Sequence, residues 1–267
     1  MAIIFDGKSY ALKKAEVLKK EVLDLNANGI FPHLASIIVG NNPASKLYVG
    51  LKKKAGEKIG IQVDVYYLSE NTKKEDLLIL IKTLNEDRCF SGIMIQLPLP
   101  ENLKLFKEEI LNTINPKKDV DGLRSDSQFL HPTSKAVIKI IDEAKEKTKK
   151  QFKDVCVVGA TGMVGESLVK KFKEENYEVI ECGKNTKDLK SKTLMCDILV
   201  SATGEEGLIN EDMVKDDAII VDVGSPKGDV DFSKVLKKAS FITPVPGGVG
   251  PVTIYCLLEN LIIACKI

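Results

Sequence analysis

The stretch that decides the fold is Asp154-Val155-Cys156-Val157-Val158-Gly159-Ala160-Thr161-Gly162-Met163-Val164-Gly165. The apolar run 155–158 predicts a buried strand, and the glycines after it predict a tight turn that opens a helix. Glycines let the backbone approach a phosphate, and a helix N-terminus offers free N–H groups with a positive dipole. The stretch therefore favours a dinucleotide site. Its spacing is G-x-x-G-x-x-G rather than the common G-x-G-x-x-G, so a tight turn without a ligand remains the alternative.

The residue that reads the cofactor's ribose is expected about 20 residues after such a loop. Two residues compete for this role. Glu181 could accept hydrogen bonds from the ribose hydroxyls of NAD, whereas Lys184 could pair with the additional phosphate of NADP. Either one could instead be a solvated surface charge. We expect NADP as the cofactor, without excluding NAD.

Strands and helices alternate on both sides of this loop, which predicts an α/β protein with parallel strands and helical crossovers. A last helix over 252–265 is almost wholly apolar, and we expect it to pack back on the first domain, because the second already has its crossovers. The other predicted helices cover 8–27, 44–59, 73–85, 133–149 and 163–175. The predicted strands cover 33–39, 61–68, 92–97, 155–158, 177–182, 198–201 and 218–223.

Length and composition indicate an ordinary globular protein of about two domains. The 267 residues carry a formal net charge of +1, so no global field attracts nucleic acid or a membrane surface. No apolar run approaches the ~20 residues that span a bilayer, and the N-terminus lacks the pattern of a signal peptide. We therefore expect a cytoplasmic protein with no nucleic-acid or membrane partner.

The cysteines and histidines give no sign of a metal site. The six cysteines form no C-x-x-C pair and there are only two histidines, so zinc-ligand spacing is absent and no metal is expected. A cysteine–histidine nucleophile stays open as an alternative, but buried thiols are the better interpretation.

Three segments of the first half could carry chemistry. Tyr48 and Lys52 lie four residues apart, on one face of a predicted helix. Gln96 stands at the carboxyl end of a buried strand, where ligands bind in open α/β sheets. Lys118-Asp119-Val120-Asp121-Gly122 places carboxylates in a turn. Each feature alone is also compatible with an amphipathic helix, a strand-end amide or an Asx turn.

Taken together and in this order, the segments resemble the bifunctional methylenetetrahydrofolate dehydrogenase/cyclohydrolase family, over nearly the whole chain. The two most specific runs are Gln96-Leu97-Pro98-Leu99-Pro100 and Thr243-Pro244-Val245-Pro246-Gly247-Gly248-Val249-Gly250-Pro251. The others are Asp6-Gly7-Lys8, Pro43-Ala44-Ser45, Tyr48-Val49-x-x-Lys52 and Lys118-Asp119-Val120-Asp121-Gly122.

The resemblance implies two α/β domains. A folate-binding catalytic domain would comprise residues 1–135 and 251–267, and a Rossmann-like NAD(P)-binding domain residues 136–250. Tetrahydrofolate derivatives would bind in a cleft between them, and family members usually dimerise through the second domain, so a homodimer is expected. The implied function is oxidation of 5,10-methylenetetrahydrofolate to 5,10-methenyltetrahydrofolate with NAD(P)⁺, followed by hydrolysis to 10-formyltetrahydrofolate. Both reactions belong to one-carbon metabolism, which feeds purine biosynthesis.

The resemblance also assigns site residues by matched position. Lys52 corresponds to the catalytic lysine, Gln96 to its hydrogen-bonding partner and Asp121 to the carboxylate that holds the pterin edge; Tyr48 would stack on the folate. The expected substrate-binding set is Tyr48, Gln96, Leu97, Pro98, Asp121, Pro246, Gly247 and Gly248. The expected cofactor-binding set is Gly159, Ala160, Thr161, Gly162, Val164, Gly165, Lys184 and Thr203.

These residue types suit the chemistry. Hydride loss from the methylene carbon is driven by the nitrogen lone pairs, so alignment matters more than a base. Ring opening needs water addition and proton movement, hence a general acid/base. A lysine can serve if burial lowers its pKa, and a neutral glutamine can orient it without stabilising its charge as a carboxylate would.

The chain departs from the family pattern on the cofactor side and at the domain join, the regions that bear on cofactor preference and affinity. The departures are His131-Pro132-Thr133-Ser134-Lys135-Ala136, Ser167, Gly183-Lys184 and Ala202-Thr203-Gly204-Glu205-Glu206. Three alternatives follow: a monofunctional dehydrogenase, which the presence of Lys52 disfavours, a non-catalytic folate- or nucleotide-binding relative, and an unrelated NAD(P) dehydrogenase. Reduced-nicotinamide absorbance on adding methylenetetrahydrofolate would separate an enzyme from a binding protein.

Overall fold

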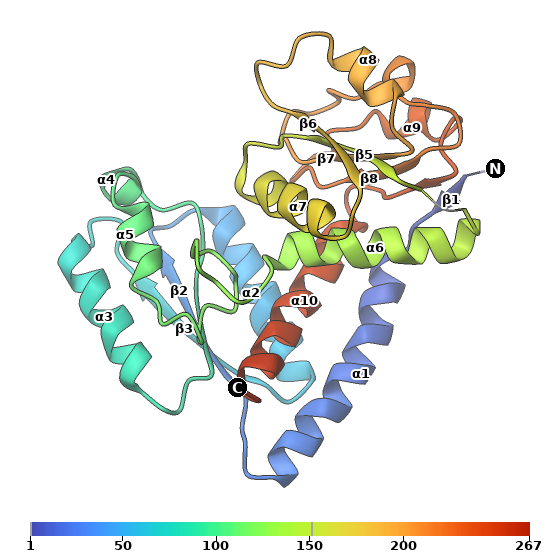
Figure 1. Cartoon of the computed structure of the whole chain (residues 1–267). Coiled ribbons are helices and arrows are strands. Elements are labelled where there is room, and N and C mark those ends of the chain that lie inside the picture. The colour runs from blue at the N-terminus through green and yellow to red at the C-terminus, as the bar shows by residue number, and fades with distance from the viewer. Residues whose placement is uncertain (1, 151) are drawn as a thin grey trace. The chain divides into compact units, whose positions relative to one another are not determined.

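The chain forms two compact units (Figure 1) in a computed structural model that describes residues 2–150 and 152–267. The three-stranded unit comprises Leu12–Pro132 and Ile254–Ile267. The six-stranded unit comprises Thr133–Thr253 together with the described residues before Leu12. Each unit takes its name from its parallel sheet.

The three-stranded unit has its sheet in the order β3-β2-β4. The central strand is almost wholly buried, because it has a partner on each edge and helices pack on it. Ile37 of this strand lies between Tyr66 and Ile95 in the register. The strands are β2 (His33–Val39), β3 (Gln62–Leu68) and β4 (Gly92–Ile95), and the helices are α2 (Pro43–Lys58), α3 (Lys74–Glu86), α4 (Glu101–Lys104) and α5 (Lys107–Asn112).

The six-stranded unit has its parallel strands in the order β1-β9-β8-β7-β5-β6. The strands are β1 (Ile3–Ile4), β5 (Asp154–Val158), β6 (Glu178–Cys182), β7 (Ile198–Ser201), β8 (Ile219–Asp222) and β9 (Phe241–Ile242). Around them lie α6 (Pro132–Thr148), α7 (Met163–Glu174), α8 (Leu189–Leu194), α9 (Phe232–Val235) and the 3₁₀ turn η1 (Glu211–Met213). The predicted two-domain α/β fold with parallel sheets is confirmed.

Residues 2–11 lie in a different unit from the one that the sequence predicts. The prediction groups residues 1–135, but β1 pairs with β9, Ile3 opposite Phe241 and Ile4 opposite Ile242. The N–H of Phe5 continues this pairing by donating to the carbonyl of Ile242 at 2.9 Å. Helix α1 (Gly7–Ala27) therefore begins in the six-stranded unit and continues into the three-stranded unit.

The last helix, α10 (Val249–Ala264), packs back on the three-stranded unit as predicted, and that unit includes its residues from Ile254 onward. Leu261 occupies the space that a Cβ on Gly92 would need, at 2.6 Å from Cδ1, so glycine lets β4 lie close to the helix. Glu259 forms an ion pair with Lys14 of α1. Although α10 is apolar, no helix in the described part of the chain has the combined length and hydropathy needed to cross a membrane.

Candidate active site

Lys52 is the centre of the candidate site in the three-stranded unit. Helix α2 begins with Pro43, and the Asn42 side chain caps it by accepting a hydrogen bond from the Ser45 N–H at 3.0 Å. Val49, buried on the same helix, fixes the rotation of the helix against the sheet. Three residues later, the half-buried Lys52 directs its Nζ to the Oε1 of Gln96, at 3.1 Å.

Gln96 is held at both its backbone and its amide. It directly follows β4, and its N–H donates to the carbonyl of Ile37 at 2.8 Å. Its Nε2 donates to the carbonyl of Leu97 at 2.8 Å, which leaves Oε1 facing the amine of Lys52. Leu97 packs on the core of the unit and Pro98, which follows it, is exposed. The expected strand-end glutamine thus contacts the expected lysine.

Tyr48 lies one turn before Lys52 on α2 and is accessible to a ligand. Its side chain is 36% exposed, which is high for a large aromatic residue in a unit with a packed core. An exposed ring beside a buried amine is the arrangement expected for stacking on a flat ligand.

The first two residues of the Lys118–Gly122 turn have structural roles. The Nζ of Lys118 donates to the carbonyls of Leu84, at 3.0 Å, and Asp87, at 2.7 Å, at the end of α3. The carboxylate of Asp119 is fully buried and accepts hydrogen bonds from the N–H groups of Leu123, at 3.2 Å, and Arg124, at 3.0 Å. These contacts fix the turn and leave Asp121 as its other carboxylate.

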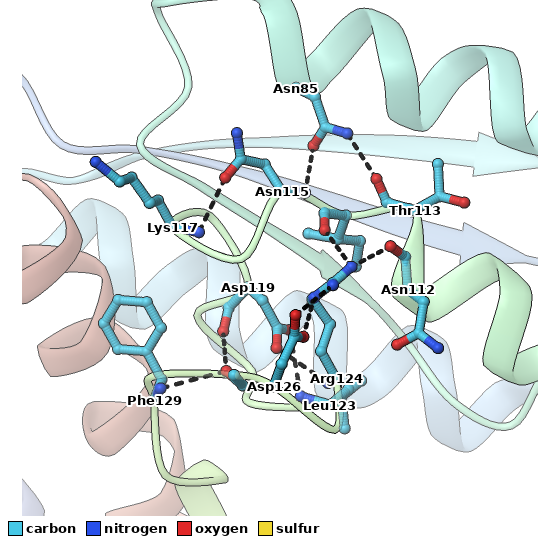
Figure 2. Close-up of polar contacts among 12 residues, drawn as sticks. Asn85, Asn112, Thr113, Asn115, Lys117, Asp119, Leu123, Arg124, Asp126 and Phe129 are labelled. Atoms are coloured by element: carbon cyan, nitrogen blue, oxygen red, sulfur yellow. Dashed lines mark hydrogen bonds and ion pairs between the residues drawn. The ribbon is translucent and has the colours of Figure 1, made fainter.

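Arg124 ties the turn to the segment after α5 (Figure 2). Its guanidinium donates to the carbonyls of Asn112 and Ile114, the latter at 2.8 Å, and forms two hydrogen bonds to Asp126 at 2.7 and 2.9 Å. Asn85 binds the same segment from α3, with its amide nitrogen on the Thr113 carbonyl at 2.7 Å. The loop that carries Asp121 is therefore held rigidly.

Lys52, Asp121 and His131 lie within electrostatic range of one another. Burial lowers the pKa of Lys52, and the charge of Asp121 opposes this shift. Burial also lowers the pKa of His131; Asp121 raises it, and Lys52 lowers it further. The structure thus gathers Lys52, Gln96 and Asp121, the three residues expected to be catalytic. It adds His131, which the sequence marked only as a departure from the family pattern.

The glycine loop of the six-stranded unit has the shape that a pyrophosphate needs. Gly159 has φ +88°, and a Cβ there would lie 2.4 Å from the Ala202 carbonyl oxygen. A Cβ on Gly165 would lie 2.1 Å from the Gly159 oxygen, so only glycine permits this close turn. Helix α7 starts after Gly162 with no side-chain cap, which leaves its first N–H groups and its dipole available to a phosphate.

The remaining residues of the loop surround this helix start. Ala160 is buried, Thr161 is exposed, and Val164 is half-buried in the first turn. Lys184 is exposed in the segment after β6, as the NADP interpretation requires. The carboxylate of Glu181 forms an ion pair with Lys173 at 2.6 Å.

Thr203 is held by an aspartate that the sequence patterns do not reveal. Both its N–H and its hydroxyl donate to Oδ2 of Asp229, at 2.7 and 2.9 Å, and Ser201 donates to the same oxygen at 2.9 Å. Asp229 is fully buried, and its N–H donates to the buried carboxylate of Asp222 at 3.0 Å. The turn over 224–229 is thereby joined to the loop that follows β7.

Pro246, Gly247 and Gly248 lie in the six-stranded unit, unlike the other expected substrate-binding residues. A Cβ on Gly7 would lie 1.9 Å from the carbonyl oxygen of Gly248, so the start of α1 packs directly on this run. The preceding Asp6 caps α1 by accepting from the N–H and hydroxyl of Ser9. Two segments from opposite ends of the chain, both matched to the family on sequence, are thus in contact.

Comparison with known proteins identifies the family. Residues 5–121 match the catalytic-domain model of tetrahydrofolate dehydrogenase/cyclohydrolase, and residues 131–267 match its NAD(P)-binding-domain model. The chain belongs to this family. The resemblance stated on sequence motifs is therefore confirmed, and with it the dehydrogenase and cyclohydrolase activities and the NAD(P)-binding domain.

The likeness to individual family members extends over the whole chain. The bifunctional protein FolD of Lactobacillus acidophilus is 43% identical over 277 aligned positions, covering 98% of this chain and 96% of that protein. The crystal structure of the bifunctional FolD enzyme of Campylobacter jejuni superposes with a TM-score of 0.92 at 41% identity, covering 100% of this chain and 99% of that one. The Trypanosoma brucei enzyme, described as complexed with NADP and an inhibitor, gives 0.91 at 31% identity, with 99% and 97% covered.

Proposed function

We propose that the protein oxidises 5,10-methylenetetrahydrofolate with NADP and hydrolyses the product to 10-formyltetrahydrofolate, and that Lys52, Gln96 and Asp121 form one folate site for both reactions, where Lys52 is required for hydrolysis and contributes less to oxidation. The observation that carries this proposal is the 3.1 Å contact between the Lys52 amine and the Gln96 amide oxygen. It pairs a titratable nitrogen with a neutral partner in partly buried surroundings, where burial lowers the pKa of the lysine.

The oxidation step requires alignment more than proton transfer. A nicotinamide cofactor held at the Gly159–Gly165 loop would supply the acceptor for the hydride of the methylene carbon. The residues of the chain orient the folate: Tyr48 stacks on its flat ring and Asp121 accepts paired hydrogen bonds from the pterin amino group and ring N–H. Orientation of this kind supplies a large part of the rate of such reactions.

The hydrolysis step requires a group that takes and returns protons. Water adds to the methenyl carbon as Lys52 removes one of its protons. Lys52 then protonates the ring nitrogen as the carbon–nitrogen bond breaks, and the remaining hydroxyl proton passes to solvent as the formyl C=O forms. The Gln96 oxygen orients the amine at each stage. A carboxylate in its place would hold the lysine in its charged form, whereas the amide does not.

The cofactor preference for NADP rests on Lys184 and Glu181. Lys184 is an exposed cation in the loop where the ribose phosphate is expected, and such contacts are charge-assisted. The Glu181 carboxylate, which would repel that phosphate, is engaged by Lys173 at 2.6 Å. The similar Trypanosoma brucei enzyme is complexed with NADP, which supports NADP as a cofactor of this chain.

The setting is cytoplasmic one-carbon metabolism, with 10-formyltetrahydrofolate passing to purine biosynthesis and the protein acting as a homodimer. All six cysteines are free thiols, which suits a reducing compartment. Within the described residues β6 is an edge strand of its sheet, paired with β5 alone, and its second edge can receive a strand of another copy. Light scattering after size-exclusion chromatography checks the dimer.

A spectrophotometric assay with methylenetetrahydrofolate and each cofactor in turn tests the proposed function. Reduced-nicotinamide absorbance should appear with NADP at a higher specificity constant than with NAD, and methenyltetrahydrofolate absorbance should decay faster with the enzyme than without it. Absence of both signals would contradict the proposal.

A further inference from the structure

A single buried asparagine joins the two loops that carry Asp121 and His131. Asn260 of α10 is only 2% exposed, and its Nδ2 donates to the carbonyls of Val120, at 2.9 Å, and Leu130, at 3.0 Å. These two carbonyls belong to the residues directly before Asp121 and His131. The asparagine therefore fixes the backbone directly before each of these two residues.

Glycine at 122 brings the same two loops into direct contact. Gly122 has φ +63°, and a Cβ there would lie 2.6 Å from the Phe129 carbonyl oxygen and 2.9 Å from the His131 nitrogen. No larger residue could occupy this position without separating the loops. Two segments about ten residues apart in the chain are thus locked side by side.

We propose that His131 is a positioning residue of the cyclohydrolase reaction, held at the Lys52–Asp121 site by the Asn260 amide and acting on both groups through its protonation state. This inference rests on the proposed function, because it concerns the same folate site. The ionisable groups that act on His131 are Asp121, from the adjoining loop, and Lys52, from α2. Asp119 in turn interacts with Asp121.

The direction of the effect follows from the charges. A neutral imidazole leaves the Asp121 carboxylate free to accept hydrogen bonds from the pterin. An imidazolium would pair with that carboxylate and would also repel the cationic methenyl substrate. The substrate should therefore bind best above the pKa of His131, which burial lowers, and binding should weaken as the pH falls through that value.

The decisive test compares His131→Gln with His33→Gln, which removes the only other histidine of the chain. His33 is a suitable control because it begins β2, away from the carboxyl end of the sheet, and pairs with Asp64. KM and kcat for methenyltetrahydrofolate hydrolysis are measured from neutral to acidic pH. In wild type and His33→Gln, KM should rise about tenfold as the pH falls from neutral to acidic. A tenfold change corresponds to a difference of one pKa unit. In His131→Gln this rise should disappear.

A second comparison tests the role of the asparagine. Asn260→Leu removes the hydrogen bonds to the Val120 and Leu130 carbonyls, and Asn85→Leu removes the two hydrogen bonds that Asn85 makes with Thr113 and Asn115 (Figure 2). We expect the rise of KM at acidic pH to disappear in Asn260→Leu, as it does in His131→Gln. In Asn85→Leu the rise should persist. NADP affinity should stay unchanged in both, since their contacts lie in the three-stranded unit.

The outcomes separate this inference from the proposed function. A rise of KM at acidic pH that persists in His131→Gln overturns the inference, even if Asn260→Leu fails to fold. A folded Asn260→Leu with the wild-type pH profile overturns the positioning role of the asparagine. Either result leaves the proposed function intact as long as wild type hydrolyses methenyltetrahydrofolate. A wild-type enzyme with no hydrolysis at any pH would contradict the proposed function itself.

Discussion

The amine of Lys52 lies 3.1 Å from the amide oxygen of Gln96, although the two residues are 44 positions apart in the chain. The contact joins the third turn of α2 to the end of β4. The Gln96 nitrogen donates to the Leu97 carbonyl, so only the Gln96 oxygen faces Lys52. In the Lys52–Gln96 hydrogen bond the lysine is therefore the donor and the glutamine the acceptor. This arrangement holds the lysine in place without stabilising its charged form as a carboxylate would, as a catalytic base that must lose and regain a proton requires.

The first prediction concerns pH. Burial lowers the pKa of Lys52, so its neutral fraction grows as the pH rises toward that lowered value. The kcat of ring opening should therefore rise with pH and level off below the pH at which an ordinary lysine loses its proton. The kcat of oxidation, which needs no base, should not rise with pH in this way. Lys52→Arg is the control, because arginine keeps the charge but does not deprotonate in this range, and its residual activity should be flat with pH.

The same shift has a consequence for stability. The unfolded chain binds a proton at Lys52 up to a higher pH than the folded chain does, so the free energy of unfolding should increase as the pH rises between the two pKa values. This increment should be absent in Lys52→Met. Urea unfolding of both proteins across the alkaline range measures it, and equal pH slopes would show that the lysine is not desolvated in the native state.

Asp121 should matter for folate affinity. Removing a carboxylate that pairs with buried polar groups costs about 1–3 kcal/mol, so Asp121→Ala should weaken binding of a folate ligand by that amount. Asp126→Ala is the matched control, since Asp126 is an exposed aspartate of the same loop that pairs with Arg124. Calorimetry on both variants measures the difference. Equal affinities in a folded Asp121→Ala would remove Asp121 from the site.

Lys184 should set the cofactor preference. Lys184→Glu should reverse the ratio of specificity constants for NADP and NAD, because it replaces an attraction to the ribose phosphate by a repulsion. Lys170→Glu, which makes the same charge change at an exposed position of α7, should leave the ratio near its wild-type value. A clear NAD preference of the wild-type enzyme would refute the assignment outright.

Asp229 should support the cofactor loop. Asp229→Ala leaves the Thr203 N–H and the Ser201 hydroxyl without their shared acceptor, which should cost about 1–3 kcal/mol of unfolding free energy. NADP affinity should also fall, since Thr203 loses its fixed position. Asp231→Ala loses a helix cap on α9 nearby and should cost about 1 kcal/mol without changing NADP affinity. Unchanged cofactor binding in Asp229→Ala would show that Thr203 is not part of the site.

Local patterns predict much of the fold and of the site. The strands over 33–39 and 198–201 have the predicted bounds, because a short apolar run between turn residues allows few other structures. Residue type and matched family position predict Lys52 and Gln96 as partners, and the structure places them in contact.

Long-range pairing accounts for what the sequence could not reveal. The strands β1 and β9 have two residues each, too few for any period, and they exist because distant segments pair. Asn260 gives only a weak signal, as a lone amide in an apolar helix, and its partners Val120 and Leu130 are 140 and 130 residues away. His131 lies at the site because its loop closes on Gly122, which no local pattern encodes.

Lys52 is required for ring opening and contributes less to oxidation at the same site. The most direct test follows both reactions in a single folded sample of Lys52→Met, which keeps the stem's apolar packing and deletes the amine. Ring opening should fall by about 10²–10⁴-fold, the usual contribution of a positioned acid/base, while oxidation with NADP remains measurable. Ring opening at the wild-type rate would mean that another group moves the protons and that the role given to Lys52 is wrong.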